Sequence, residues 1–286
     1  MDAFQESIQL APGIYLQASA QKFRLHRLLP WDTLPCQERL MASADLQVTR
    51  QMMAGAFYAG LSQRADAEGN VATGIKATTP SLLHYIYTLA GSWQTTHATP
   101  PTMRRVAQRL MERGQNTVAA HCLEVAAEES GHDTLALMDL AALGLPAQQF
   151  VERFQPKNTV ALVAQFARFA DSDEPIAVLG YAYTLERRAL FNTETSIAMI
   201  ERLIPAGVNA TRCLRVHSAV GNDTGHVAES LELIATLSPQ DRAAIVRAVY
   251  TTTSLQSAAA PDYPGDGAMR ALLDEFEWSM AKQSLA

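Results

Sequence analysis

Apolar residues recur every three or four positions along most of this chain, which is the spacing of one face of an α-helix. No run of alternating β-branched residues is long enough to predict a strand, and residues 1–35, which contain three prolines, are expected to be irregular. The chain is therefore expected to be a bundle of helices. The predicted helices cover 37–64, a segment that starts at Thr79-Pro80, a segment from Pro100-Pro101 to near Gly114, and the ranges 116–143, 159–171, 175–205, 208–237, 239–256 and 268–283.

Capping residues and helix breakers set several of these boundaries. The run Ser238-Pro239-Gln240-Asp241 predicts the start of the 239–256 helix, and Gly144, ahead of Pro146, predicts the end of the 116–143 helix. Interruptions are expected near Asn192 and at Gly221-Asn222, and the proline-containing stretch 258–267 is expected to be a loop. No linker precedes that loop, so one helical-bundle domain over residues 1–286 is the economical interpretation.

Two polar residues interrupt the apolar face of the predicted 116–143 helix. Glu129 and His132 stand three positions apart, so on one continuous helix both side chains point the same way. Burying both is costly unless something binds them, and a metal ion is the simplest such partner. Glu128 is the alternative to Glu129 as the inward carboxylate. The face consists of Cys122, Val125, Glu129, His132 and Ala136.

Two later helices carry similar interruptions. Glu186 occupies an apolar-face position in the predicted 175–205 helix. In the predicted 208–237 helix, Asp223 and His226 form a second carboxylate and imidazole pair, with His217 upstream. Taken singly, each has a simpler explanation: a histidine satisfied within the core, or a glutamate paired with a nearby arginine. Taken together, three carboxylates and three imidazoles could surround two divalent irons.

The remaining chemistry narrows the class of metal site and of partner. The three cysteines, Cys36, Cys122 and Cys213, form no closely spaced pair, so ligands of mixed oxygen and nitrogen favour iron or manganese over structural zinc. The net charge is −6 and no basic stripe with aromatic residues occurs, so we expect no nucleic-acid partner. Neither a targeting segment nor a membrane span is evident, and we expect a cytoplasmic protein. The apolar final helix leaves a homodimer open.

The chain resembles the haem-oxygenase-like di-iron oxidases and oxygenases and, more distantly, the thiaminase-II-like and pyrroloquinoline-quinone-synthase-like proteins of the same fold. The matching pieces are Glu129-Ser130-Gly131-His132, Leu179-Gly180-Tyr181 leading to Glu186, and His217 followed by Asp223-Thr224-Gly225-His226. The similarity covers roughly residues 40–256, with 1–39 and 257–286 as peripheral extensions. The resemblance implies an all-α, haem-oxygenase-like helical bundle. It also implies iron ligands at Glu129, His132, Glu186, His217, Asp223 and His226.

One spacing departs from the family pattern. The family's last motif reads H-x-x-x-D-x-x-H, whereas His217 and Asp223 are six positions apart here. Six residues of an ideal helix turn through roughly 600°, so these two side chains would not share a face. Either the helix unwinds near Gly221, or His217 is not a ligand.

The resemblance implies an enzyme that holds two Fe²⁺ ions and uses O₂ as a co-substrate to oxidise a small molecule. The implied reactions are N-oxygenation of an amine or amino-acid derivative and oxidative C–C cleavage of an acid. Tyr85, Tyr87, Tyr181 and Tyr183 are candidates to line the substrate cavity. Two alternatives stand beside this hypothesis. One is a metal-free enzyme of the same fold that uses these residues for acid–base chemistry, and the other is a non-enzymatic helical interaction protein.

Overall fold

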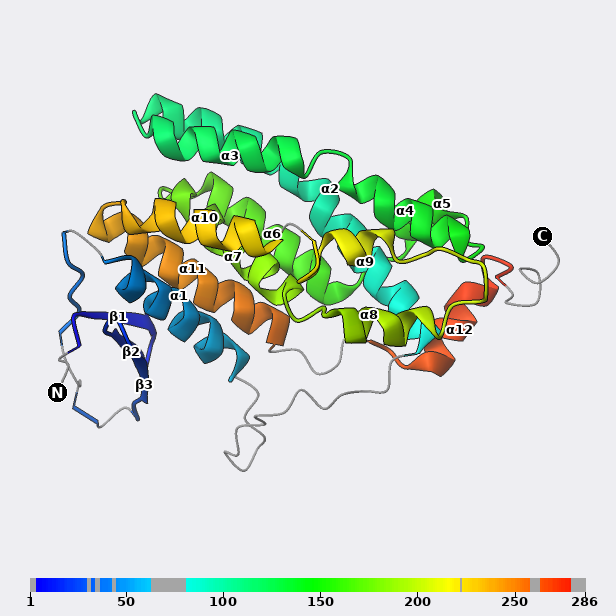
Figure 1. Cartoon of the computed structure of the whole chain (residues 1–286), viewed down its shortest axis with the longest axis horizontal. Helices are drawn as coiled ribbons and strands as arrows, with labels where there is room; N and C mark the ends of the chain where they lie inside the picture. The colour runs from blue at the N-terminus through cyan, green and yellow to red at the C-terminus, as the bar shows by residue number, and fades with distance from the viewer. Residues whose placement is uncertain are drawn as a thin grey trace.

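The protein is an elongated bundle whose helices run mostly along its long axis (Figure 1). The computed structural model describes residues 4–29, 32–33, 37–42, 45–62, 81–221, 223–257 and 263–278. A small sheet lies at one end and the helix α12 at the other. The longer helices are α1 (Leu46–Leu61), α2 (Leu82–Glu112), α3 (Asn116–Glu128), α4 (His132–Ala142), α6 (Lys157–Asp171), α7 (Val178–Ala189), α10 (Asp223–Ala235) and α11 (Pro239–Ser257). The shorter ones are α5 (Ala147–Arg153), the 3₁₀ turn η1 (Pro175–Ala177), α8 (Glu194–Glu201), α9 (Arg212–Val216) and α12 (Asp266–Asp274).

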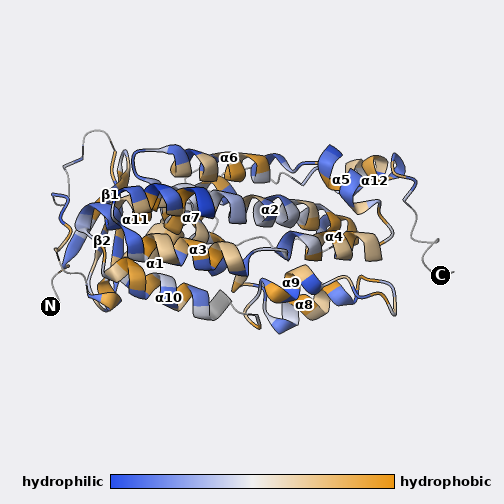
Figure 2. Cartoon of the chain, turned by 90° about the horizontal axis from the view of Figure 1, so that it is seen from above, coloured by the Kyte–Doolittle hydropathy of each residue, from blue (hydrophilic) through white to orange (hydrophobic). Residues whose placement is uncertain are grey.

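Two hydrophobic cores share helix α2. Its first half, including Ile86 and Leu89, packs in one core with α4, α5 and α12. Its second half, including Met103 and Val106, belongs to the other core, with α1, α3, α6, α7 and α11. Most helices carry both hydrophilic and hydrophobic residues (Figure 2), as amphipathic helices with one buried face do. The expected mostly helical bundle is confirmed.

The prediction that the N-terminal residues are irregular was wrong. Strands β1 (Glu6–Ala11), β2 (Ile14–Ala18) and β3 (Phe23–Arg27) form an antiparallel sheet in the order β1-β2-β3. Ile8 and Leu16 are fully buried, and Leu16 packs so closely on Gly55 of α1 that a Cβ there would lie 2.4 Å from its Cδ1. Period-two alternation in strands of five or six residues carried the signal, and packing on α1 and α11 stabilises it.

Helix α2 does not restart at Pro100-Pro101, which corrects a second prediction. The helix runs unbroken from Leu82 to Glu112 with both prolines inside it. Each proline removes one backbone hydrogen bond, at a local cost of about 3 kcal/mol. Buried apolar residues on both sides of the prolines, among them Leu89 and Met103, outweigh that cost through their packing.

A third correction concerns the predicted 116–143 helix, which is broken. Helix α3 ends at Glu128, and Gly131 takes the left-handed backbone conformation, with φ of 92°, before α4 begins at His132. The expected breaks near Asn192 and at Gly221 are present, because α7 and α8 flank the first, and α9 and α10 flank the second. The predicted helix start at Thr79-Pro80, residues 258–262 of the predicted loop, and the end of the final helix beyond residue 278 lie outside the described residues.

Among the described helices, no single one is long and apolar enough to cross a membrane. Asn116–Ala142 and Ala147–Arg153 meet the length and composition criteria only as a pair, with a bend of 109° between them.

Candidate metal centre

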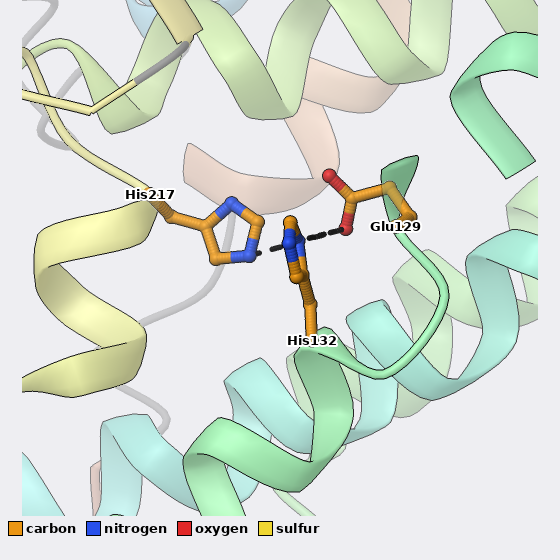
Figure 3. Close-up of side chains that lie close together, drawn as sticks. All are labelled: Glu129, His132 and His217. Atoms are coloured by element: carbon orange, nitrogen blue, oxygen red, sulfur yellow. Dashed lines mark hydrogen bonds and ion pairs between the residues drawn. The ribbon is translucent and has the colours of Figure 1, made fainter. Parts of the chain in front are cut away.

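Glu129 at the end of α3, His132 at the start of α4 and His217 at the end of α9 lie close together (Figure 3). Nδ1 of His132 lies 3.3 Å from Oε2 of Glu129, and Nε2 of His217 lies 3.9 Å from the same oxygen. The two imidazole rings stand nearly perpendicular, at 78°, with their centroids 5.1 Å apart. Two imidazoles, from distant parts of the chain, therefore lie close to one carboxylate oxygen of Glu129.

The break between α3 and α4 positions the first two of these side chains. Glu129 caps the end of α3, and its carbonyl accepts a 3.2 Å hydrogen bond from the backbone N–H of His132. Arg104 of α2 donates a 2.8 Å hydrogen bond to Ser130 Oγ in the same break. The chain turns between the two residues because Gly131 has a left-handed backbone conformation. Residues with a side chain rarely adopt this conformation. The pair is thus held by a turn and not by one helix face.

His217 lies at the end of the short helix α9. Hydrogen bonds to Asn192, a residue between α7 and α8, hold the loop that follows it. Asn192 Nδ2 donates a 3.2 Å hydrogen bond to the carbonyl of His217, and the Asn192 carbonyl accepts one of 3.0 Å from Ala219 N–H. A Cβ at Gly221 would lie 2.1 Å from the carbonyl oxygen of Val216, so the tight turn here needs glycine. The chain is non-helical at His217, and this non-helical segment lets His217 reach Glu129 despite its unusual spacing from Asp223.

The electrostatics keep Glu129 ionised. Burial alone would raise the pKa of its carboxyl, but the hydrogen bond with His132 and the charge of His217 together hold that pKa below its ordinary value of 4.5. The side chain of Glu129 is 17% exposed, and those of His132 and His217 are 26% and 24% exposed. An anionic oxygen flanked by two imidazoles is thus shielded from most of the solvent.

This donor set fits a divalent metal ion. One atom from each residue can be chosen so that all three lie within 4.8 Å of one another. Adjacent ligands of an ion bound at about 2.1 Å lie about 3 Å apart, so small side-chain movements would bring these atoms to coordination distance. One carboxylate and two imidazoles suit iron, manganese or zinc. The absence of a thiol ligand among them makes a structural zinc site the poorer match.

A second group of histidine and carboxylate side chains lies beside the first. Nε2 of His226 is 3.5 Å from Oε2 of Glu128. Both residues line a small cavity together with His121, Glu124 and Glu229. Burial lowers the pKa of His121 despite the surrounding carboxylates, which favours a neutral ring. Metal ligands need a neutral imidazole of this kind.

Sequence reasoning missed His121, Glu124 and Glu229. The signal was present in helical spacing: His121, Glu124 and Glu128 step by three and four along α3, and His226 and Glu229 are three apart on α10. These residues lie next to the apolar face on which the prediction concentrated. A search for polar residues in phase with one another, and not only for those within apolar faces, would have found them.

Glu186 lies between the two groups. Its side chain lines both the small cavity and a much larger one, which Glu129 and His217 also line. The structure thus brings Glu129, His132 and His217 into one group and Glu128 and His226 into another. Asp223 begins α10 next to the second group, but its side chain lies outside the described residues.

The larger cavity has a volume of about 520 Å³. Tyr87 and Tyr181 line it, as the sequence suggested. Tyr85 and Tyr183 do not: both are buried elsewhere, and the hydroxyl of Tyr85 donates a 2.7 Å hydrogen bond to the Ala210 carbonyl. A cavity of this size accommodates a small organic molecule.

One solved structure resembles most of this chain. It is the crystal structure, at 2.30 Å resolution, of a domain of unknown function with a haem oxygenase-like fold from Shewanella denitrificans. The TM-score is 0.56 with 20% sequence identity, and the match covers 82% of this chain and 94% of that one. The protein has a haem-oxygenase-like fold. At this identity the likeness concerns the fold alone, and neither a protein-family model nor a curated protein matches the sequence.

The haem-oxygenase-like bundle gives the site its setting. Helices α2, α3, α6, α7 and α11 all contribute side chains to the large cavity, and the Glu129 group forms part of its wall. The N-terminal sheet packs on α1 and α11 and contributes no residue to it. The candidate metal-binding residues and the cavity wall therefore both belong to the helical bundle.

Proposed function

We propose that this protein is a non-haem di-iron enzyme that uses O₂ to oxidise a small molecule. The observation that carries the proposal is the group of Glu129, His132 and His217, two members of which line a 520 Å³ cavity. Metal-binding side chains at the wall of a substrate-sized cavity are the expected arrangement for a metal-dependent enzyme. The proposed reaction is N-oxygenation of an amine or amino-acid derivative, or oxidative C–C cleavage of an acid.

Each group of side chains would hold one iron. Glu129, His132 and His217 would bind the first, and Glu128, His226 and Asp223 the second. Glu186, which lines both cavities, would lie between them. When bound, the two Fe²⁺ ions would bind O₂ and would donate the electrons that reduce it, which no side chain here can provide.

The side chains of the chain itself perform the remaining tasks. The ionised carboxylate of Glu129 offsets part of the charge of a metal ion, and the two imidazoles beside it are fixed by the α3–α4 turn and by Asn192. The walls contributed by α2, α6 and α7 would orient a bound substrate. Ferrous iron requires a reducing compartment, and we place the enzyme in the cytoplasm, where the free thiols of Cys122 and Cys213 would also persist.

Anaerobic titration with Fe²⁺, followed by metal analysis and oxygen-consumption measurement, tests the proposal. We expect close to two irons per chain, and close to one in Glu129→Ala. Glu152→Ala, a change on the exposed surface of α5, serves as the control and should bind iron as the unaltered protein does. A chain that takes up no iron and consumes no oxygen would favour the metal-free enzyme. Full activity without iron would exclude the proposal outright.

A further inference from the structure

We propose that the large cavity recognises a polar zwitterion the size of an amino acid, with Arg188 binding its carboxylate and a hydroxyl-lined face of α2 binding its amino group. This inference rests on the proposed function for the reaction, but the binding itself needs no metal. Three independent features of the cavity wall support it.

The first feature is a row of hydroxyl groups along α2. Thr88, Ser92, Thr95 and Thr99 follow one another at intervals of four, three and four, which places them on one face of the helix, and all line the cavity. The corresponding positions in an enzyme for fatty acyl chains would be expected to carry leucine, isoleucine or phenylalanine. A wall of hydroxyl groups instead matches a substrate that forms hydrogen bonds.

The hydroxyl protons on this face are already committed. Thr88 donates a 3.0 Å hydrogen bond to the His84 carbonyl, and Thr99 donates one of 2.9 Å to the Thr95 carbonyl. Thr95 likewise donates to the Ser92 carbonyl at 3.0 Å. A hydroxyl whose one proton is used in this way still has acceptor lone pairs. The face therefore suits a ligand with N–H or O–H donors.

The second feature is the placement of positive charge. Arg188 is the one arginine or lysine among the described residues that line the cavity. A guanidinium group binds a carboxylate through two parallel hydrogen bonds, a geometry that a lysine cannot reproduce. Glu129 and Glu186 line other parts of the same cavity, so a zwitterion finds charges of both signs there.

The third feature is a pair of buried polar atoms that a ligand could satisfy. The hydroxyl of Tyr181, a residue only 1% exposed, and Oε1 of Gln256 both belong to cavity-lining residues, and neither has a hydrogen-bond partner within the described part of the chain. Burial raises the pKa of Tyr181, so its hydroxyl keeps its proton and remains a donor. Leaving such groups unsatisfied is costly, so a polar ligand would gain affinity from them.

Ligand-observed NMR on the full chain in the presence of EDTA tests this proposal. Two mixtures are compared: the twenty standard L-amino acids, and linear fatty acids of six to fourteen carbons. We expect saturation transfer to at least one amino acid. Two analogues of that amino acid, one lacking the amino group and one lacking the carboxylate, are then titrated by calorimetry. Each should bind at least tenfold more weakly than the amino acid itself. Binding confined to the fatty acids, or no binding in either mixture, would overturn the proposal.

Variants link binding to the named residues. Arg188→Gln should weaken binding of the amino acid at least tenfold. Tyr181→Phe should weaken it by about five- to tenfold, as expected for the loss of one hydrogen bond. Arg187→Gln, a change at the adjacent position that does not line the cavity, is the matched control and should alter the Kd less than twofold. An equal effect of the Arg188 and Arg187 changes would contradict the assignment. Because EDTA removes iron, failure of iron binding leaves this test intact, and failure of this test leaves the iron titration intact.

Discussion

Glu128 and Glu129 are neighbours in the chain, yet their carboxylates contact different histidines. Glu128 Oε2 lies 3.5 Å from His226, whereas Glu129 Oε2 lies 3.3 Å from His132. Successive residues of a helix point about 100° apart. Glu129, the cap of α3, still has a helical backbone, and its N–H donates a 3.0 Å hydrogen bond to the Val125 carbonyl. The two carboxylates are therefore not alternatives for one position, since each faces its own group of metal-competent side chains.

The separate positions of these carboxylates predict separable metal defects. Glu129→Ala and Glu128→Ala should each lower the iron content from about two to about one per chain, and the double variant should bind almost none. Changes to the outer-shell partners of metal ligands alone cost about 10- to 100-fold in affinity, so the loss of a direct ligand should cost at least as much. Anaerobic metal analysis measures this directly. If Glu128→Ala retains both irons, the group around His226 is not a metal site.

Replacing Gly131 should disturb the site without any steric clash. A Cβ at this position would meet nothing within 4 Å, so Gly131→Ala tests backbone conformation alone. An alanine forced to a φ of 92° should lower the free energy of unfolding by about 1–2 kcal/mol and weaken iron binding, because Glu129 and His132 flank the turn. Gly267→Ala on α12, which also has open space but no positive φ, is the control for urea denaturation. Equal unfolding energies for the two variants would argue against strain at Gly131.

Gly180 allows α7 to approach α11. A Cβ there would lie 2.4 Å from the Ile245 carbonyl oxygen and 2.8 Å from the Ala248 Cβ. Gly180→Ala should therefore push the helices apart and lower the free energy of unfolding by about 1–3 kcal/mol. Because Glu186 lies on the same helix, iron binding should fall as well. Urea denaturation with a parallel metal titration checks both effects, and a variant as stable as the original chain would contradict the close packing.

The N-terminal sheet is joined to α11 by a buried ion pair. Glu6 Oε1 lies 2.9 Å from Arg242 Nη2, and the two side chains are 2% and 3% exposed. Arg242→Met leaves the buried carboxylate of Glu6 without its counter-charge and should cost about 3–5 kcal/mol of stability at neutral pH. Replacing both residues with methionine should come within about 1–2 kcal/mol of the original chain, or exceed it. Thermal and urea denaturation of both variants distinguish these outcomes.

The same pair gives a pH dependence of known sign. Burial raises the pKa of Glu6 above its ordinary value of 4.5, more than the charge of Arg242 lowers it. The folded chain therefore holds this proton more tightly than the unfolded chain. The free energy of unfolding should fall as the pH rises from about 4.5 through the raised pKa. The double methionine variant should lack this component, and an identical pH profile in both proteins would refute the linkage.

The helical fold class could be predicted from the sequence, because apolar residues spaced by three or four positions share one buried face only on a helix. Sequence patterns failed where tertiary packing overrides local preference. The strands β1 to β3 are too short to be evident without α1 beneath them, and α2 continues through Pro100 because packing on both sides outweighs two lost hydrogen bonds.

For the site, residue types were more informative than helical phase. Glu129 and His132 were grouped by assuming one straight helix, whereas the structure joins them through a left-handed glycine. His217 was in doubt because of its spacing, and the non-helical stretch after α9 removes that constraint. His121 and Glu229 of the second group lie outside the apolar helix faces, so a pattern of polar residues within those faces does not predict them.

Helix α2 belongs to both hydrophobic cores, and the large cavity lies along its middle, between them. Each core packs on its own half of this one continuous helix, and α2 thus joins the two cores, so we expect them to melt as one cooperative unit. A ligand in that cavity would then raise the melting temperature of the entire chain and not of one end. A simple thermal-shift screen can therefore report on occupancy of this cavity.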